Sequence, residues 1–173
     1  MKKLLLLIFF SISLIVTAQQ KKQTHTEAVK TIDGVLTKML TIISGEKGKK
    51  RDWKALENLF LPSATFSVRS PDKSYETQFE TVNLEDFIES LKDSYYDNGF
   101  YEVETGKVVN EFNGVANVFQ SFYGKDSEGN EERGINSYQL VYLKNRWWIA
   151  NMVWTFETDE VKIPKKYIRE TKH

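Results

Sequence analysis

The longest regular pattern of hydrophobic and polar positions runs from residue 132 to residue 158 and predicts a β-hairpin. Both halves are dense in β-branched and aromatic residues, and turn-forming types separate them only at Lys144 and Asn145. A two-residue turn sets the register, with Leu143 opposite Arg146. Hydrophobic residues then fall on both faces, so we expect both faces of the hairpin to be covered.

This register assigns every hairpin residue to one of two faces. The first face carries Asn136, Tyr138, Leu140 and Tyr142 opposite Val153, Asn151, Ile149 and Trp147. The second face carries Ile135, Ser137, Gln139 and Val141 opposite Trp154, Met152, Ala150 and Trp148. We expect the first face to line the interior of the fold and the second to lie outside it.

Apolar residues recur at helical spacing in three earlier stretches. The first begins at a capping-box pair, Thr24 and Glu27, and ends at Gly45. A shorter helix begins after Asp52, and a third begins after Asn83, since both residues are favoured N-caps.

Alternating patterns predict further strands over residues 64–70, 75–82, 100–112 and 115–125, with a tight turn at 113–114. The order is two helices, a hairpin, a helix and four antiparallel strands. It indicates an α+β fold in which a curved antiparallel sheet wraps around the N-terminal helices. Such a sheet forms a cone with an internal cavity, where a ligand would bind.

The N-terminus has the pattern of a signal peptide. Lys2 and Lys3 precede an apolar run over residues 4–16, and Ala18 offers a cleavage site. The alternative is a membrane anchor, but the run is shorter than the roughly 20 residues that a span needs. We therefore expect export to the periplasm or the extracellular side, with a signal peptide at 1–18, a domain at 19–158 and a C-terminal tail at 159–173.

Composition excludes several kinds of chemistry. The chain has no cysteine, so it has no disulfides, thiol catalysis or lipid-modified cysteine. Its 24 basic and 24 acidic residues leave no electrostatic footprint for nucleic acid. The histidines, His25 and His173, lie at the ends of the chain. No cluster has metal-ligand spacing, and we expect neither a metal nor a cofactor.

Three segments of the late strands resemble the nuclear transport factor 2-like superfamily, including its SnoaL-like branch. They are A-x-V-F-Q-S-F at 116–122, R-G-I-N-S-Y-Q-L-V at 133–141 and R-W-W-I-A-N at 146–151, the last followed by Trp154. The resemblance covers about residues 24–157 and implies the same cone-shaped, cystatin-like fold. The superfamily includes isomerases, dehydratases, polyketide cyclases, ligand binders and docking modules, so the likeness does not select a function.

Candidate ligand-binding residues follow from the predicted interior face. They are Gln120, Arg133, Asn136, Tyr138, Tyr142, Trp147 and Asn151. Amide and phenol groups there would orient a carbonyl or hydroxyl, although satisfied buried polar groups would give the same pattern. Arg133 would hold an anion at the cavity mouth or pair with a neighbouring carboxylate.

Enzymes of this fold typically use an Asp or His as acid or base, and no histidine of this chain lies in a strand. The carboxylates on offer are Glu102, Glu104 and Glu111, but they lie in a polar stretch that is typical of a solvated face. No catalytic residue is therefore assigned.

The second face predicts an interface between two copies of the chain. Its residues are Ile135, Val141, Trp148, Met152 and Trp154. A monomer rarely leaves such a patch in water, and aromatic residues and Met are enriched in interface cores. Alternatively, the tail folds back over the patch through Ile163, Tyr167 and Ile168.

Three classes of function remain after this reasoning. The leading hypothesis is an exported homodimer that binds a small, apolar or mixed-polarity molecule without an assigned reaction. The second is a SnoaL-like isomerase, cyclase or dehydratase that uses a Glu with Tyr138. The third is a protein-docking module of the cell envelope, which would be favoured if Tyr142, Trp147 and Phe122 filled the cavity.

Overall fold

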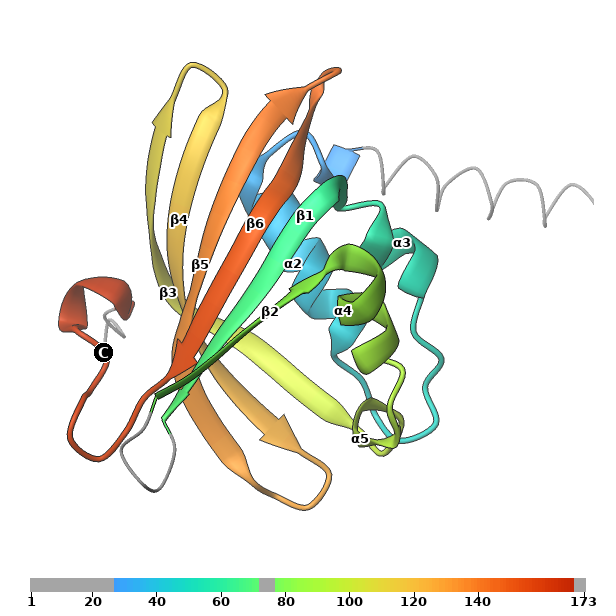
Figure 1. The fold of residues 1–173 in the computed structure, drawn as a ribbon, viewed down its shortest axis with the longest axis vertical. Helices are drawn as coiled ribbons and strands as arrows, with labels where there is room; N and C mark the ends of the chain where they lie inside the picture. Colours follow the sequence, from blue (N-terminus) through green and yellow to red (C-terminus); the bar gives the residue numbers. More distant parts are fainter. Residues whose placement is uncertain (1–26, 72–76, 170–173) are drawn as a thin grey trace, which may run out of the picture.

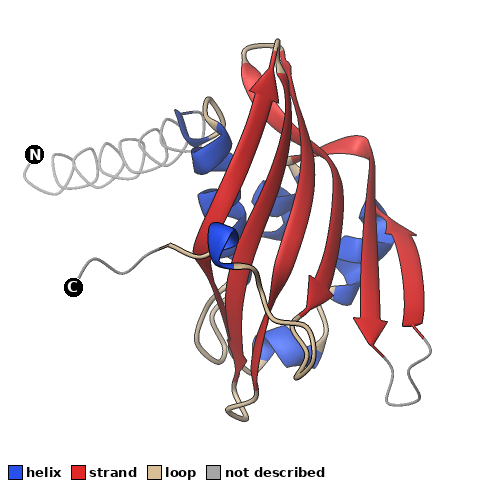
Figure 2. Cartoon of the chain, turned by 90° about the vertical axis from the view of Figure 1, so that its left-hand side faces the viewer, coloured by secondary structure: helices blue, strands red, loops and turns tan. Residues whose placement is uncertain are grey.

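Six strands form one curved sheet, and the helices α2 to α5 lie on its concave side (Figures 1 and 2). The structure is a computed structural model that describes residues 27–71 and 77–169. The strands are β1 (Phe60–Pro71), β2 (Thr77–Asn83), β3 (Phe100–Phe112), β4 (Val115–Asp126), β5 (Glu131–Leu143) and β6 (Arg146–Phe156). The helices are α2 (Ile32–Ile43), α3 (Trp53–Glu57), α4 (Leu84–Ser90), α5 (Ser94–Asp97) and the 3-10 turn η1 (Lys165–Tyr167).

The strand order across the sheet is β2-β1-β6-β5-β4-β3. Strands β3 to β6 form a continuous antiparallel meander, as the sequence predicts. The first hairpin joins this meander through β1, which runs parallel to β6. The predicted α+β fold class, a curved sheet around helices, is confirmed, and the parallel β1–β6 pair is an addition to it.

Both long hairpins turn where the sequence predicts. Asn113 and Gly114 have φ of 46° and 78°, and Lys144 and Asn145 have φ of 52° and 62°. Two consecutive positive φ angles define the tight turn that matches the twist of antiparallel strands, and Asn and Gly adopt them at low cost. The second turn pairs Leu143 with Arg146, as expected.

The register of the β5–β6 hairpin changes at Ala150. Leu140 pairs with Ile149, but the next pair joins Gln139 to Asn151, so Ala150 is an extra residue in β6. A bulge of one residue exchanges the faces of every residue beyond it. The predicted facing of residues 151–154 is therefore wrong: Met152 and Trp154 point into the cone, and Asn151 and Val153 point away from it.

The first long helix begins later than predicted. Thr31 is the N-cap of α2, and its hydroxyl accepts a hydrogen bond from the Gly34 amide at 3.0 Å. A side chain at Gly34 would lie 2.0 Å from the Ala28 carbonyl oxygen, so the preceding chain crosses α2 at this point. The continuous helix predicted from Thr24 is wrong for residues 29–31, and Thr24 itself lies outside the described residues.

The core lies between the helices and the concave face of the sheet. The apolar stripe of α2 is buried, as predicted, with Val35, Leu36 and Met39 each at most 2% exposed. Beside it, the rings of Phe66 and Phe87 stack at 3.9 Å between centroids. These contacts join α2 and α4 to the sheet and leave the wide end of the cone open.

The tail docks on the outer face of the sheet, in front of the strands in Figure 2. Tyr167 stacks on Phe119 at 5.5 Å, and the Ser121 hydroxyl donates to the Tyr167 carbonyl oxygen at 2.6 Å. A side chain at Gly106 would lie 2.3 Å from that oxygen, so glycine permits the close approach. Of the predicted tail contacts, Ile163 is buried, and Tyr167 packs over β3 and β4 rather than over the centre of the predicted patch.

No helix within the described ranges is long and apolar enough to cross a membrane. The predicted signal peptide at residues 1–18 lies outside those ranges. It stays a prediction.

Candidate functional site

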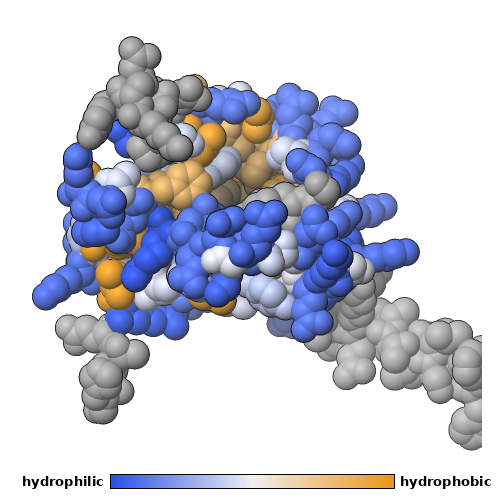
Figure 3. Space-filling view, turned by 90° about the horizontal axis from the view of Figure 1, so that it is seen from below, coloured by the Kyte–Doolittle hydropathy of each residue, from blue (hydrophilic) through white to orange (hydrophobic). Residues whose placement is uncertain are grey.

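A cavity of about 260 Å³ lies at the wide end of the cone, between the sheet and helices α2, α4 and α5. Its aromatic lining is Phe87, Tyr96, Phe100, Phe122, Trp154 and Phe156, and its aliphatic lining is Met39, Ile43, Leu56, Leu91 and Met152. Figure 3 shows the hollow from outside, with hydrophobic residues within it and hydrophilic residues around it. The cavity therefore suits a small molecule with a large apolar surface.

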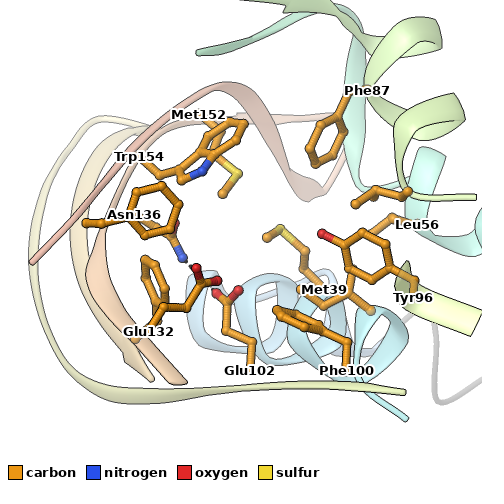
Figure 4. A pocket seen from close by; sticks show the side chains of 14 residues that line it. Met39, Leu56, Phe87, Tyr96, Phe100, Glu102, Glu132, Asn136, Met152 and Trp154 are labelled. Carbon is orange, nitrogen blue, oxygen red and sulfur yellow. Dashed lines mark hydrogen bonds between the residues drawn. The ribbon is translucent and has the colours of Figure 1, made fainter. Parts of the chain in front are cut away.

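The polar end of the cavity consists of Glu102, Glu132 and Asn136 (Figure 4). Glu102 and Glu132 flank Gly124 in the same cross-strand row, since Gly124 pairs with both of them. A side chain at Gly124 would lie 3.1 Å from the Cγ atom of Glu132. Glycine at this place thus gives both carboxyl groups room to point into one space, as Figure 4 shows.

Glu102 is held at both its backbone and its side chain. Its amide donates to the Ser44 hydroxyl at 3.0 Å, which ties β3 to the end of α2. The Asn136 side-chain amide donates to the Glu102 carboxyl oxygen at 2.9 Å.

Burial raises the pKa of Glu102 to about 7, and the Glu132 charge adds to the rise while the Asn136 hydrogen bond opposes it. At neutral pH this carboxyl can both accept and donate a proton.

A buried chain of hydrogen bonds leads away from Glu102. The Asn136 side chain also lies next to the Tyr138 hydroxyl. Tyr138 in turn donates to the Gln120 side-chain oxygen at 3.3 Å, and the Gln120 amide donates to Glu104 at 2.8 Å. Burial raises the pKa of Tyr138 well above its ordinary value, so its hydroxyl stays protonated and donates.

The far end of this chain meets basic side chains at the edge of the sheet. Lys107 binds Glu104 at 2.8 Å and also reaches Asp33 at 3.2 Å. Arg169, in the docked tail, forms a second ion pair with Glu104. The chain therefore connects a carboxyl group in the cavity with a neutralised carboxylate near the surface.

Three of the predicted ligand-binding residues come together in this arrangement. Asn136 lines the cavity, while Gln120 and Tyr138 lie directly behind it and are 0% exposed. They contribute to the site through the hydrogen-bond chain rather than through a surface in the cavity.

The other four predicted residues lie away from the cavity. Tyr142 and Trp147 pack edge to face at 5.4 Å near the hairpin tip, where the cone is narrow. Asn151 points outward because of the bulge and donates to the Thr65 hydroxyl at 2.6 Å. Arg133 pairs with Glu157 at 4.0 Å, which is the ion-pair alternative considered for it.

The residues predicted for an interface between copies divide into two groups. Ile135 and Val141 alternate with inward residues and lie on the outer face, together with Trp148, whose ring carries the Arg146 guanidinium at 3.8 Å. Met152 and Trp154 line the cavity instead. The bulge at Ala150 accounts for this correction.

The prediction that the β3 carboxylates form a solvated face is wrong for two of them. Glu102 lines the cavity and Glu104 is 13% exposed at its side chain, whereas Glu111 is exposed. Glu132 was not predicted. The glycine at 124, in an otherwise side-chain-rich strand, is the sequence signal that could have indicated a close approach there. Among the described residues, no three His, Cys, Asp or Glu side chains gather as a metal site would require.

The fold and the cavity define an α+β cone with an internal site, and solved structures show which fold this is. An NTF2-like protein from Cytophaga hutchinsonii superimposes with a TM-score of 0.54 over 70% of this chain and 92% of that protein, at 16% identity. A cystatin-like protein of unknown function from Nostoc punctiforme gives 0.54 over 72% and 87%, at 8% identity. The chain has the NTF2-like, cystatin-like fold.

The comparisons say little about activity. A candidate aromatic ring hydroxylase from Novosphingobium aromaticivorans gives a TM-score of 0.55 over 73% of this chain and 87% of that protein, at 12% identity. Similar structures from Methylobacillus flagellatus and Shewanella oneidensis, with TM-scores of 0.50 and 0.52, are NTF2-like proteins of unknown function. No protein-family model matches the chain.

One curated protein matches in sequence. The exocyst complex component SEC10 of Saccharomyces cerevisiae is 24% identical in an alignment 148 residues long, which covers 75% of this chain and 17% of that protein. The chain thus spans about a sixth of the length of this relative. At this identity and coverage, the match assigns neither a family nor an activity.

Proposed function

We propose that the chain is an exported domain that binds a small, largely apolar molecule in its cavity. One observation carries the proposal: aromatic and aliphatic walls enclose a space toward which Glu102, Glu132 and Asn136 all point. A well-formed apolar pocket with a few convergent polar groups is the usual form of a ligand site. Its volume of about 260 Å³ is near the lower limit of such sites, so the ligand is small.

Native mass spectrometry of the protein from its own envelope fraction tests this proposal. We expect a reproducible extra mass, which would also identify the ligand. The matched variant is Leu91→Trp, which fills the cavity from the C-terminal end of α4, and the control is Val153→Trp on the outer face. The extra mass should disappear from the first variant and persist in the second. An extra mass that survives Leu91→Trp would place the ligand elsewhere and contradict the proposal.

A second candidate function is proton transfer on the bound molecule, as in an isomerase, cyclase or dehydratase. The observation in its favour is Glu102, whose pKa of about 7 and hydrogen bond from Asn136 suit a general acid or base. Glu102→Gln should then still bind the recovered ligand but leave it chemically unchanged, whereas the wild type converts it. Identical product mixtures from both proteins would exclude this role.

The proposal includes export and self-association. Export is supported by the N-terminal pattern, and recovery of the shortened chain from the envelope fraction would test it.

Self-association through the outer face is supported by Ile135 and Val141, although the inward orientation of Met152 and Trp154 makes that face less apolar than predicted. The same mass spectra measure it, and a monomer at micromolar concentration would contradict it. A docking module has less support, because Tyr142 and Trp147 lie away from the cavity, and Phe122 lines the cavity but leaves a space of about 260 Å³.

A further inference from the structure

The cavity has an unbalanced set of polar groups. Among the described residues that line it, two are acidic and none is Lys, Arg or His. The Asn136 side-chain amide donates to Glu102, and the indole N–H of Trp154 and the hydroxyl of Tyr96 are neutral groups of the lining that can also donate. The cavity therefore offers a ligand several hydrogen-bond acceptors and negative charge.

The two carboxyl groups converge on one place. Gly124 separates Glu102 from Glu132 in a cross-strand row, and the Glu132 side chain passes over it. The two carboxyl groups lie close to each other in the cavity (Figure 4). Asp126 lies close enough to Glu132 to add to the negative potential. Like charges held together in a partly buried site favour a bound cation between them.

Glu104 shows how the protein balances a buried carboxylate elsewhere. Lys107 and Arg169 both pair with it, although it lies two residues from Glu102 on the same face of β3. No basic residue plays this part for Glu102 or Glu132 among the cavity-lining residues described. A ligand with a positively charged group can supply this missing counter-charge.

The remaining walls of the cavity are compatible with a cation. The ring of Trp154 lies 6.3 Å from that of Phe87, and the ring of Phe100 lies 5.0 Å from that of Tyr96. Aromatic faces attract ammonium groups and accept the apolar part of the same molecule.

We propose that the cavity ligand is a small apolar amine, whose ammonium group sits between the carboxyl groups of Glu102 and Glu132 while its hydrocarbon part contacts the aromatic walls. This inference rests on the proposed binding function and deepens it. A matched alcohol would lack the charge, and a matched carboxylate would be repelled. The amine should bind about tenfold or more tightly than the matched alcohol, because one of its hydrogen bonds to the protein is charge-assisted.

The charges around Glu102 give the pH dependence of this binding. Burial is the main cause of its raised pKa of about 7, and the charge of Glu132 adds to the rise. The Tyr138 hydroxyl also interacts with the Glu102 carboxyl group. An ammonium group favours the ionised carboxyl, so binding releases a proton when the pH is near or below 7. The affinity for the amine should therefore fall as the pH decreases from 8 to 5.5.

The test uses three probes with one phenyl ring each: 2-phenylethylamine, 2-phenylethanol and 3-phenylpropionate. Isothermal titration calorimetry at pH 8 and 5.5, in two buffers of different ionisation enthalpy, measures affinity and proton release. We expect the amine to bind most tightly at pH 8 and the carboxylate not to bind. Glu102→Gln and Glu132→Gln should each remove the preference for the amine, whereas Glu111→Gln, exposed on β3, should leave it unchanged.

The outcomes separate this inference from the function on which it rests. Equal binding of amine and alcohol, abolished by Leu91→Trp, would overturn the amine inference and support the cavity as a binding site. Binding of none of the three probes, with a bare protein in native mass spectra, would overturn both. A preference for the amine that survives both carboxyl substitutions would also overturn the inference, because it would place the ammonium elsewhere.

Discussion

Glu102 and Glu104 lie two residues apart on the same face of β3, at the two ends of one buried hydrogen-bond chain. Glu104 has Lys107 and Arg169 as partners, whereas Glu102 has an amide and a second carboxyl group as neighbours. A carboxylate with two cations contributes to folding, and a carboxyl group without one opposes folding when it ionises. The comparison indicates that Glu104, at one end of the hydrogen-bond chain, stabilises the fold, whereas Glu102, at the other end, is available for a ligand.

The largest expected effect is at Glu102. Its pKa is raised from 4.5 to about 7 in the folded protein, which corresponds to about 3 kcal/mol. Because the folded pKa is the higher one, the native state binds the proton more tightly, and its stability falls as the pH rises from about 4.5 to 7. Glu102→Gln should therefore stabilise the protein by up to about 3 kcal/mol at pH 8 and by almost nothing at pH 4.

Urea unfolding of both proteins at the two pH values measures this difference. An equal change in the free energy of unfolding at pH 4 and pH 8 would mean that ionisation of Glu102 is not responsible. Glu111→Gln is the matched control, because Glu111 is exposed on the same strand, and its substitution should change stability by less than about 0.5 kcal/mol.

The opposite sign is expected at Glu104. Glu104→Gln leaves Lys107, only 14% exposed, with a single remaining carboxylate partner in the described chain, Asp33. It also removes the ion pair with Arg169, so the docked tail should loosen. We expect a loss of about 2 kcal/mol at pH 7, typical of hydrogen bonds to charged groups. Urea unfolding measures the loss, and faster removal of the tail by limited proteolysis would confirm its origin. If Glu104→Gln instead stabilised the protein, the two ends of the hydrogen-bond chain would not differ as proposed.

The link between the two ends is tested at Tyr138. Tyr138→Phe removes the hydroxyl that donates to Gln120 and lies next to Asn136, and it should reduce stability by about 1 to 2 kcal/mol. A double-mutant cycle with Glu102→Gln should then show a coupling of at least about 0.5 kcal/mol, since the residues share one network. Strict additivity would mean that the two ends behave independently.

The smallest change in stability is expected at Gly124. Gly124→Ala places a methyl group about where Glu132 now passes, and because that side chain is flexible, stability should change by less than about 1 kcal/mol. Displacement of Glu132 weakens the charge repulsion at Glu102, so the pKa of Glu102 should decrease. Carbon-detected NMR titration of the Glu carboxyl groups measures this. An unchanged titration of Glu102 would show that the glycine does not set the distance between the two acids.

Local patterns were sufficient to predict most elements of the fold. The turns at 113–114 and 144–145, the N-caps Asp52 and Asn83 and strand β3 are where the sequence places them, because each depends on a few adjacent residues. The N-terminus of α2 was mispredicted, since Thr24 and Thr31 are equally suitable caps in sequence. The crossing of Ala28 over Gly34 then favours Thr31.

The candidate site could be predicted only in part. Asn136, Tyr138 and Gln120 were expected inside the cone and lie there. They share one face of β4 and β5, and these two strands pair without a bulge. Met152 and Trp154 were assigned to the wrong face, because nothing in the alternation of β6 marks Ala150 as an extra residue. The bulge places both large side chains in the cone, where they are mostly removed from water.

By itself the sequence determined most of the secondary structure, the tight turns and the class of fold, because these depend on local propensity and on hydrophobic period. The tertiary structure alone decided the chemistry of the cavity. Alternation shows that Glu102 and Glu104 share a face, but it does not show that helices cover this face, that Gly124 lets Glu132 approach, or that the tail brings Arg169 to Glu104. Those contacts join residues 30 to 65 positions apart, and charge balance in a buried site depends on such neighbours.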